Sequence, residues 1–196
     1  MSSVSHPPQP ALDSLATTCW QRLTAATDDH TDPWRTPAIA TRSGNGAAVR
    51  TVVLRETQTA QRALSLHTDA RSAKAGELAQ APQLSWLFWD AVAREQLRCQ
   101  GRVTLHLADE VAETHWAQLT AGSRSNYRHH DAPATAISDP QTAAARRDDE
   151  NTAYGRFLVV RCVVERMDWL HLDREGHRRA RLIWTGDHWD AGWVAP

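Results

Sequence analysis

The sequence predicts a mainly β protein, an antiparallel β-barrel of Greek-key type with α-helices at its periphery. Three observations support this fold class. Short runs of alternating apolar and polar residues recur along the chain, and turn residues separate them at short intervals. Few segments have the apolar spacing of a helix. Many antiparallel strands with few helices are typical of a barrel.

The N-terminal region predicts a tail followed by one amphipathic helix. Residues 1–10 are rich in Ser and Pro, so we expect them to be disordered. Residues 11–27 place Leu12, Leu15, Cys19 and Leu23 on one face, the spacing of a helix that covers a core. We expect residues 1–33 to form the tail and helix and residues 34–196 the barrel, in a single domain overall.

The middle of the chain predicts strands with one short helix. Residues 43–46 read Ser-Gly-Asn-Gly between two apolar runs, which indicates a hairpin within residues 37–56. A third strand is expected at 62–68, a helix capped by Ser72 and running to about Gln80, and two strands at 83–90 and 95–107. In the last of these the predicted core-facing residues are Leu97, Cys99, Val103, Leu105 and Leu107.

The rest of the chain alternates helix, irregular segment and strands. Residues 109–121 predict a helix with Val111, Trp116 and Leu119 facing inward and Gly122 after its end. Residues 122–153 are polar and without periodicity, and so long a segment is usually functional or disordered. Residues 156–172 and 178–196 predict the closing β-structure.

Composition excludes several classes of protein. A net charge of −1 over 196 residues gives no general attraction for nucleic acid or an anionic membrane. No apolar run reaches the roughly 20 residues that span a bilayer, and residues 1–13 do not resemble a signal peptide. Three widely spaced cysteines argue against a disulfide framework or a metal cage. We therefore expect a soluble cytoplasmic protein without a metal.

The segment His67-Thr-Asp-Ala-Arg-Ser-Ala-Lys74 contains the only lysine of the chain; the other 21 of the 22 basic residues are arginine. A strand is expected to end near Thr68, and Ser72 is expected to open a helix with Lys74 in its first turn. Free N–H groups at a helix start, a hydroxyl and a lysine together form an anion site. Taken alone, the pattern equally describes a capped helix with a solvated lysine.

Three segments in this order, together with the C-terminus, resemble the FMN-binding split-barrel family typified by pyridoxamine 5′-phosphate oxidase. They are Arg-Thr-Val-Val-Leu-Arg at 50–55, the segment that ends at Lys74, and Arg-Glu-Gln-Leu-Arg-Cys-Gln-Gly at 94–101. The C-terminal Trp-Val-Ala-Pro is also similar to the family's ending. The resemblance covers residues 35–196.

The resemblance implies a split barrel that binds FMN in the interface of a homodimer. The cofactor-binding residues that it implies are Arg50, Thr51, Val52, Val53, Leu54, His67, Thr68, Ser72, Lys74, Gln96, Arg98 and Arg181. Gln96 and Arg98 are expected to reach a cofactor held mainly by the partner subunit. FMN would supply the redox step, so no catalytic side chain is assigned.

The sequence departs from the family pattern at several positions, which indicates a divergent branch. Ala73 stands where the family has an arginine for the phosphate, and Arg71 is a candidate substitute. His67 stands where the family has another aromatic residue. The family's substrate residues have no clean match. We expect Arg55, Arg124, Arg128 and Arg179 to meet a small, anionic substrate.

Two classes of function remain open at this stage. The first is an FMN-dependent oxidoreductase of the pyridoxamine 5′-phosphate oxidase-like type, with an unknown substrate. The second is a non-catalytic split-barrel protein that binds a flavin or another phosphorylated ligand. Relatives with this fold also use a deazaflavin or haem, so the ligand itself is a third open point.

Overall fold

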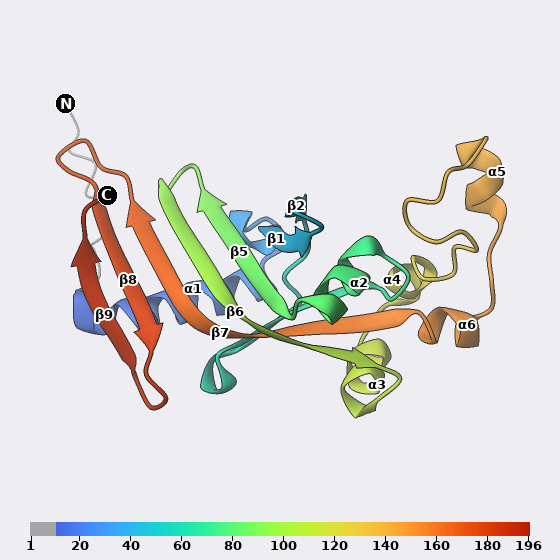
Figure 1. Cartoon of the computed structure of the whole chain (residues 1–196), viewed down its shortest axis with the longest axis horizontal. Coiled ribbons are helices and arrows are strands. Elements are labelled where there is room, and N and C mark those ends of the chain that lie inside the picture. Colours follow the sequence, from blue (N-terminus) through green and yellow to red (C-terminus); the bar gives the residue numbers. More distant parts are fainter. Residues whose placement is uncertain (1–10) are drawn as a thin grey trace.

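The strands form one antiparallel sheet that branches and does not close (Figure 1). The computed structural model describes residues 11–196. Hydrogen bonds join the strands in the order β2-β1-β5-β6-β7-β4-β3, and β8 pairs with β7 and with β9. The strands are β1 (Ala38–Ser43), β2 (Gly46–Thr51), β3 (Glu56–Gln58), β4 (Ala63–Asp69), β5 (Gln83–Asp90), β6 (Glu95–Leu107), β7 (Phe157–His171), β8 (Arg178–Trp184) and β9 (Trp189–Val194). The mainly β prediction is confirmed, and the barrel is a split one.

Helices occupy the ends and one side of this sheet. The α-helices are α1 (Leu15–Asp28), α2 (Ala73–Gln80), α3 (Glu110–Ala117), α4 (Ala121–Ser125), α5 (Pro140–Ala145) and α6 (Glu150–Tyr154). Short 3-10 turns are η1 (Leu12–Ser14), η2 (Pro33–Arg35) and η3 (Thr59–Gln61). In Figure 1, α1 crosses behind the strands on the left, while α3, α5 and α6 lie at the other end of β7.

The two long strands β6 and β7 create the branch. They pair with each other along their length, while β4 pairs with the first half of β7 and β8 with its second half. The β6–β7 register shifts between Gln100 and Gly101. A Cβ at Gly101 would lie 2.0 Å from the carbonyl oxygen of Val163, so the strands can approach this closely only at a glycine. The bulge thus separates the two halves of the sheet.

The main core lies between α1 and the sheet. The helix buries Leu15, Cys19, Trp20, Leu23 and Ala26, the stripe that its spacing predicts. Each large apolar side chain buried in this way contributes roughly 1.5–3 kcal/mol to folding. The sheet contributes the largest fully buried rings, which are Trp86, Phe88 and Trp169.

A second apolar cluster covers the first half of β7 on its other side. Trp116 of α3 packs on Phe157 of β7, with ring centroids 5.3 Å apart, and Ala153 of α6 completes the cluster with Val159. Tyr127 packs edge-on against Phe157 at 5.1 Å. These contacts hold part of residues 122–153 on the sheet. The sequence predicts an irregular segment here, and the structure shows the short helices α4, α5 and α6 in it.

Several predicted boundaries are wrong for physical reasons. The helix expected over residues 109–121 is divided into α3 and α4, and Gly122 lies inside α4. The strand β3 is too short and polar to show an alternating pattern. Leu107 is 46% exposed, because the end of β6 runs past the core that covers Leu97 and Cys99, and Leu105 is only partly buried.

Three sequence-based expectations concern features other than the sheet. The expected disorder of residues 1–10 lies outside the described residues. No helix within residues 11–196 is long and apolar enough to cross a membrane. All three cysteines are buried and unpaired.

Candidate functional site

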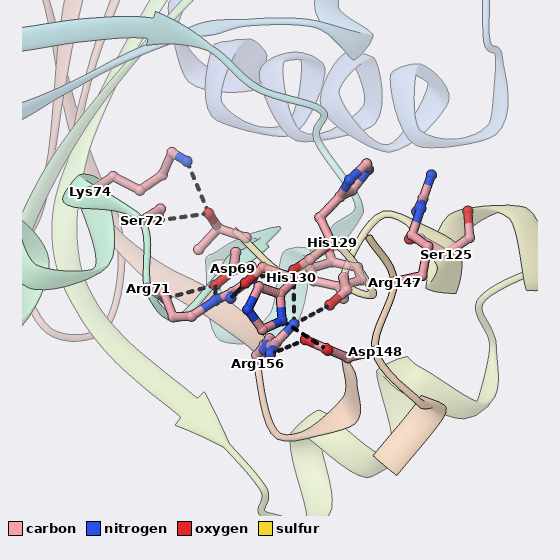
Figure 2. Close-up of polar contacts among 12 residues, drawn as sticks. Asp69, Arg71, Ser72, Lys74, Ser125, His129, His130, Arg147, Asp148 and Arg156 are labelled. Carbon is pink, nitrogen blue, oxygen red and sulfur yellow. Dashed lines mark hydrogen bonds and ion pairs between the residues drawn. The ribbon is translucent and has the colours of Figure 1, made fainter. Parts of the chain in front are cut away.

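Three of the predicted cofactor residues meet where β4 ends and α2 begins (Figure 2). The ammonium Nζ of Lys74 donates to Oγ1 of Thr68 at 2.9 Å, and this hydroxyl lies 3.1 Å from Oγ of Ser72. Thr68 and Ser72 are buried, and Lys74 is half-buried. Burial lowers the pKa of Lys74, and the nearby charge of Arg50 lowers it further. A buried cation beside two hydroxyls favours an anionic ligand.

The local sequence explains this arrangement. Asp69 ends β4, and its carboxylate accepts the backbone N–H of Arg71 at 2.8 Å, which turns the chain. The backbone N–H of Ser72 donates to the carbonyl of Asp69 at 3.0 Å, and α2 starts at the next residue. Ser72 is the N-cap, but its hydroxyl makes no bond to the helix and faces Thr68 instead. The first N–H groups of α2 therefore stay available beside Lys74.

Arg50 adds a second cation to the same region. Its guanidinium donates to Oε2 of Glu77 at 2.8 Å, to the carbonyl of Ala48 at 3.0 Å and to the hydroxyl of Thr41. Hydrogen bonds from Thr41 and Arg50 hold the pKa of Glu77 below its usual value. With Lys74 and Arg50 against one carboxylate, this cluster keeps one net positive charge. The sequence reasoning missed Thr41 and Glu77, although Glu77 lies one helical turn after Lys74.

The remaining residues of the first predicted segment lie beside Arg50 but are largely occupied by the fold. Thr51 is the exposed last residue of β2, and Leu54 is fully buried. Val52 donates its N–H to the carbonyl of Pro37 and Leu54 donates to that of Arg35. Among residues 11–196 the N–H of Val53 has no backbone partner, so this residue can offer the backbone contact that the resemblance implies.

Arg71 does not take the place of the missing family arginine at Ala73. Its guanidinium holds both carboxylate oxygens of Asp69, at 3.0 and 2.7 Å, and donates to the carbonyls of His129 and His130. Figure 2 shows it turned toward the 129–130 segment and away from Lys74. The suggestion that Arg71 could bind the phosphate is therefore wrong in this conformation.

His67 lies on the opposite face of β4 from Lys74. Its Nε2 is 3.0 Å from Nδ1 of His115, whose Nε2 is 3.4 Å from Oε2 of Glu56. Burial first, then the charges of His115 and Arg55, lower the pKa of His67 to about 3. Successive residues of a strand point to opposite faces, so Thr68 and His67 cannot both face one ligand with their side chains.

The other predicted cofactor residues, on β6 and β8, gather around the second half of β7. Asp168 accepts hydrogen bonds from Arg98 at 2.7 Å, Arg179 at 2.9 Å and Arg181 at 3.3 Å. Burial alone would raise the pKa of Asp168, but these guanidinium groups hold it below its usual value. Gln96 is half-buried and lies two residues before Arg98 on β6, where it pairs with Leu170. Three arginines around one carboxylate leave two positive charges on this face.

These two groups of residues lie at different positions along β7. Thr68 pairs with Leu158 of β7, and Arg98 pairs with Asp168 of the same strand. Ten residues of strand separate the two positions (168 − 158), which is on the order of 30 Å. Across the sheet the two groups are closer, because Thr51, Ala38, Leu87 and Arg98 are register partners on β2, β1, β5 and β6, which is three strand spacings or roughly 14 Å.

Of the four predicted substrate arginines, three are held within the fold. Arg124 donates to Glu150 at 3.0 Å and lies over the ring of Trp116. Arg128 donates to the carbonyl of Asp148 at 2.7 Å, and Arg179 is bound to Asp168. Only the guanidinium of Arg55 has no hydrogen-bond partner within residues 11–196. Its positive charge acts to lower the pKa of His67 and of Tyr127.

A cavity of about 460 Å³ adjoins the end of β4, and we call it the α5 pocket. Thr68 and Asp69 form one wall, and residues between Asn126 and Ala144 form the rest. The volume lies within the range of pockets that hold small organic ligands, roughly 300–1,000 Å³. Of these wall residues the sequence assigned only Thr68 to a ligand, because the approach of the 126–144 segment to β4 depends on the packing of Tyr127 on Phe157.

The sequence and the fold were compared with known proteins. Residues 17–107 match the family model described as pyridoxamine 5′-phosphate oxidase, FMN-binding domain. No curated protein matches the sequence.

Solved structures share the fold at low sequence identity. A pyridoxamine 5′-phosphate oxidase-related, FMN-binding protein from Nostoc punctiforme is 22% identical, with a TM-score of 0.75 over 96% of this chain and 100% of that one. PhzG from Burkholderia lata, solved with tetrahydrophenazine-1-carboxylic acid, is 16% identical, with a TM-score of 0.74 over 100% of both chains. A protein related to general stress protein 26 from Clostridium acetobutylicum is 10% identical, with a TM-score of 0.53 over 87% of this chain and 95% of that one.

The sequence match covers the segments around Arg50, Lys74 and Gln96, and the structural matches extend the same fold beyond residue 107. Residues 17–107 therefore match the FMN-binding domain of the pyridoxamine 5′-phosphate oxidase family, and the chain as a whole has the split-barrel fold of these structures.

Proposed function

We propose that this protein is an FMN-dependent oxidoreductase that works as a homodimer on a small-molecule substrate. The observation that carries the proposal is the cluster of Lys74, Thr68 and Ser72 at the start of α2. The FMN-binding description of the matching family model supports the same ligand.

The donors in this cluster fit a phosphate group. The ammonium of Lys74 has three hydrogens and uses one of them on Thr68, which leaves two for a ligand. The Ser72 hydroxyl and the first N–H groups of α2 add neutral donors beside it, and Arg50 adds charge. Bound FMN would supply two-electron redox chemistry at its ring. The chain itself then needs only to bind the cofactor and the substrate, orient them and shield them from water.

We expect the homodimer because the family that the sequence resembles binds FMN between two subunits. In this arrangement Lys74 of one subunit and Arg98 and Arg181 of the other would meet one flavin. The face of the sheet around Arg98 also exposes Leu87 and Trp89 of β5 and Ile183 of β8, at 39–49% of their surface. Exposed apolar residues of this kind are typical of an interface. The three unpaired thiols fit a reducing compartment, so we expect the cytoplasm.

One observation favours the second candidate, a flavin-binding protein without catalysis. Arg124, Arg128 and Arg179 are bound within the fold, which leaves the predicted anionic substrate with Arg55 alone. A protein that only stores or senses a flavin needs no such residues.

The visible absorption spectrum of the purified protein, with the released chromophore identified by mass, tests the proposal. A flavin spectrum and the mass of FMN would support it. The mass of a deazaflavin or haem would show that the cofactor is that molecule and not FMN. Reduction of the bound flavin by a nicotinamide donor or an amine would favour the oxidoreductase. A colourless protein that fails to bind added FMN would contradict both candidates.

A further inference from the structure

The walls of the α5 pocket carry an unusual charge pattern for a protein with 21 arginines. None of its lining residues is Lys or Arg. It contains two carboxylates, Asp69 and Asp131, and each is already paired, with Arg71 and Arg146 respectively. A negatively charged ligand would therefore lose water against walls without Lys or Arg, because the ammonium of Lys74, which donates to the wall residue Thr68, is the one assigned to the phosphate of FMN.

The nearest guanidinium groups are directed into the backbone. Arg71 donates to the carbonyls of His129 and His130, and Arg156 donates to the carbonyl of His129 at 2.8 Å and to Asp148 (Figure 2). These bonds hold the 129–130 segment over the end of β4. They also remove both arginines from the set that could bind a ligand.

The pocket offers neutral hydrogen-bonding groups instead. Asn126 and Tyr127 line it, and neither the side-chain amide of Asn126 nor the hydroxyl of Tyr127 has a hydrogen-bond partner in the part of the chain that the structure describes. Burial raises the pKa of Tyr127 to about 12, so its hydroxyl keeps its proton and can donate. Ile137, Pro140 and Ala143 provide apolar walls.

We propose that the α5 pocket binds an uncharged, ring-sized organic molecule with an oxygen acceptor. The ring lies against Ile137 and Ala143, and the oxygen accepts hydrogen bonds from Asn126 and Tyr127. This ligand class differs from the anionic substrate that the arginines of the sequence predict. That the molecule exchanges electrons with the flavin rests on the proposed function, whereas its binding does not.

A pair of probes that differ in charge tests the inference. The ketone 2-acetylnaphthalene and the carboxylate 2-naphthoate have similar size and shape. Each is titrated by calorimetry into the purified full-length protein at pH 8. We expect the ketone to bind at least about tenfold more tightly, because only the carboxylate must lose charged-group hydration without a cation.

Three variants locate the binding. Ala143→Trp fills the pocket and should abolish ketone binding, while Ala145→Trp on the same helix, which does not line the pocket, should leave it unchanged. Thr135→Arg places a cation on the wall and should bring naphthoate to equal or tighter binding than the ketone. Equal binding of both probes by the native protein, no binding of the ketone, or equal ketone binding by both tryptophan variants would overturn the inference. FMN titration of the same preparations reports separately on the proposed function.

Discussion

The ammonium of Lys74 and the hydroxyl of Thr68 lie 2.9 Å apart, although one belongs to the first turn of α2 and the other to the end of β4. The contact orients the only lysine of the chain toward the start of the helix and leaves two of its hydrogens without a partner within residues 11–196. A guanidinium is planar and larger, so this half-buried position suits an ammonium better. The preference for lysine here has a steric and an electrostatic reason.

Substitution of Gly101, the glycine at the branch of the sheet, should strongly reduce the stability of the fold. In Gly101→Ala the new Cβ would meet the backbone of Val163, which cannot move without shifting β7. We expect the free energy of unfolding to fall by about 3 kcal/mol or more, the upper end of overpacking costs. Urea unfolding followed by circular dichroism measures it.

Gly192→Ala is the matched control for this substitution. Gly192 also lies in a strand, but nothing stands within 4 Å of an added Cβ. Its unfolding midpoint should stay near that of the native protein. Similar losses in both variants would mean that the close approach at Gly101 does not determine the branch.

The fold was largely predictable where strands alternate cleanly, as β5 and β6 do. The hairpin at 38–51, both strands around Gly101 and the N-terminal helix have local patterns that report which face is buried. The segment between α3 and β7 was not predictable, because its short helices are held by distant rings such as Phe157. Its structure depends on tertiary contacts that no local pattern contains.

The candidate site divides in the same way. Thr68, Ser72 and Lys74 lie within seven residues, so turn and helix signals were enough to bring them together. Asp168 was missed because its meeting with Arg98 depends on the register of two long strands. The opposite orientation of the His67 and Thr68 side chains was also predictable, since adjacent strand residues face opposite sides.

Because His67 is largely shielded from water, the folded protein should lose stability in mild acid. Its pKa is about 3 in the folded state and 6.5 in the unfolded state, so the unfolded chain binds more protons between these values. The contribution of neutral His67 to the free energy of unfolding is complete above pH 6.5 and is lost as the pH falls toward 3. The free energy of unfolding then changes by up to about 1.4 kcal/mol per pH unit. Glu56, whose pKa is about 2 because His115 donates to it, acts in the same direction below pH 4.5.

The variant His67→Phe should flatten this dependence between pH 6.5 and about 4.5. Phenylalanine can pack on Phe157, 4.8 Å from the histidine ring, and it does not titrate. The urea midpoint measured across this pH range gives the slope, and His30→Phe, at an exposed site, should keep the native slope. An unchanged slope in His67→Phe would show that another group causes the acid sensitivity.

The proposed interface predicts complementation between two defective variants. Lys74→Met and Arg98→Gln should each weaken FMN binding in their own homodimers. In a mixed dimer, one site combines both substitutions and the other combines native Lys74 with native Arg98. We expect mixing followed by subunit exchange to restore flavin binding to one site of each mixed dimer, measured by flavin fluorescence after desalting.

The control for this experiment mixes each variant with itself. Neither sample should recover flavin binding. If the mixed sample also fails to recover while size-exclusion chromatography shows dimers that exchange subunits, Lys74 and Arg98 do not meet at one flavin across the interface.

The measurement that tests the phosphate site most directly compares FMN with riboflavin, which lacks only the phosphate. Both are titrated by fluorescence quenching into the native protein, Lys74→Met and the surface control Arg102→Gln. The native protein and the control should prefer FMN. In Lys74→Met, FMN affinity should fall roughly 10- to 150-fold, as expected for about 1.5–3 kcal/mol of charged hydrogen bonding, while riboflavin affinity stays the same. Equal affinities for FMN in the native protein and Lys74→Met would contradict the account that Lys74 binds the phosphate.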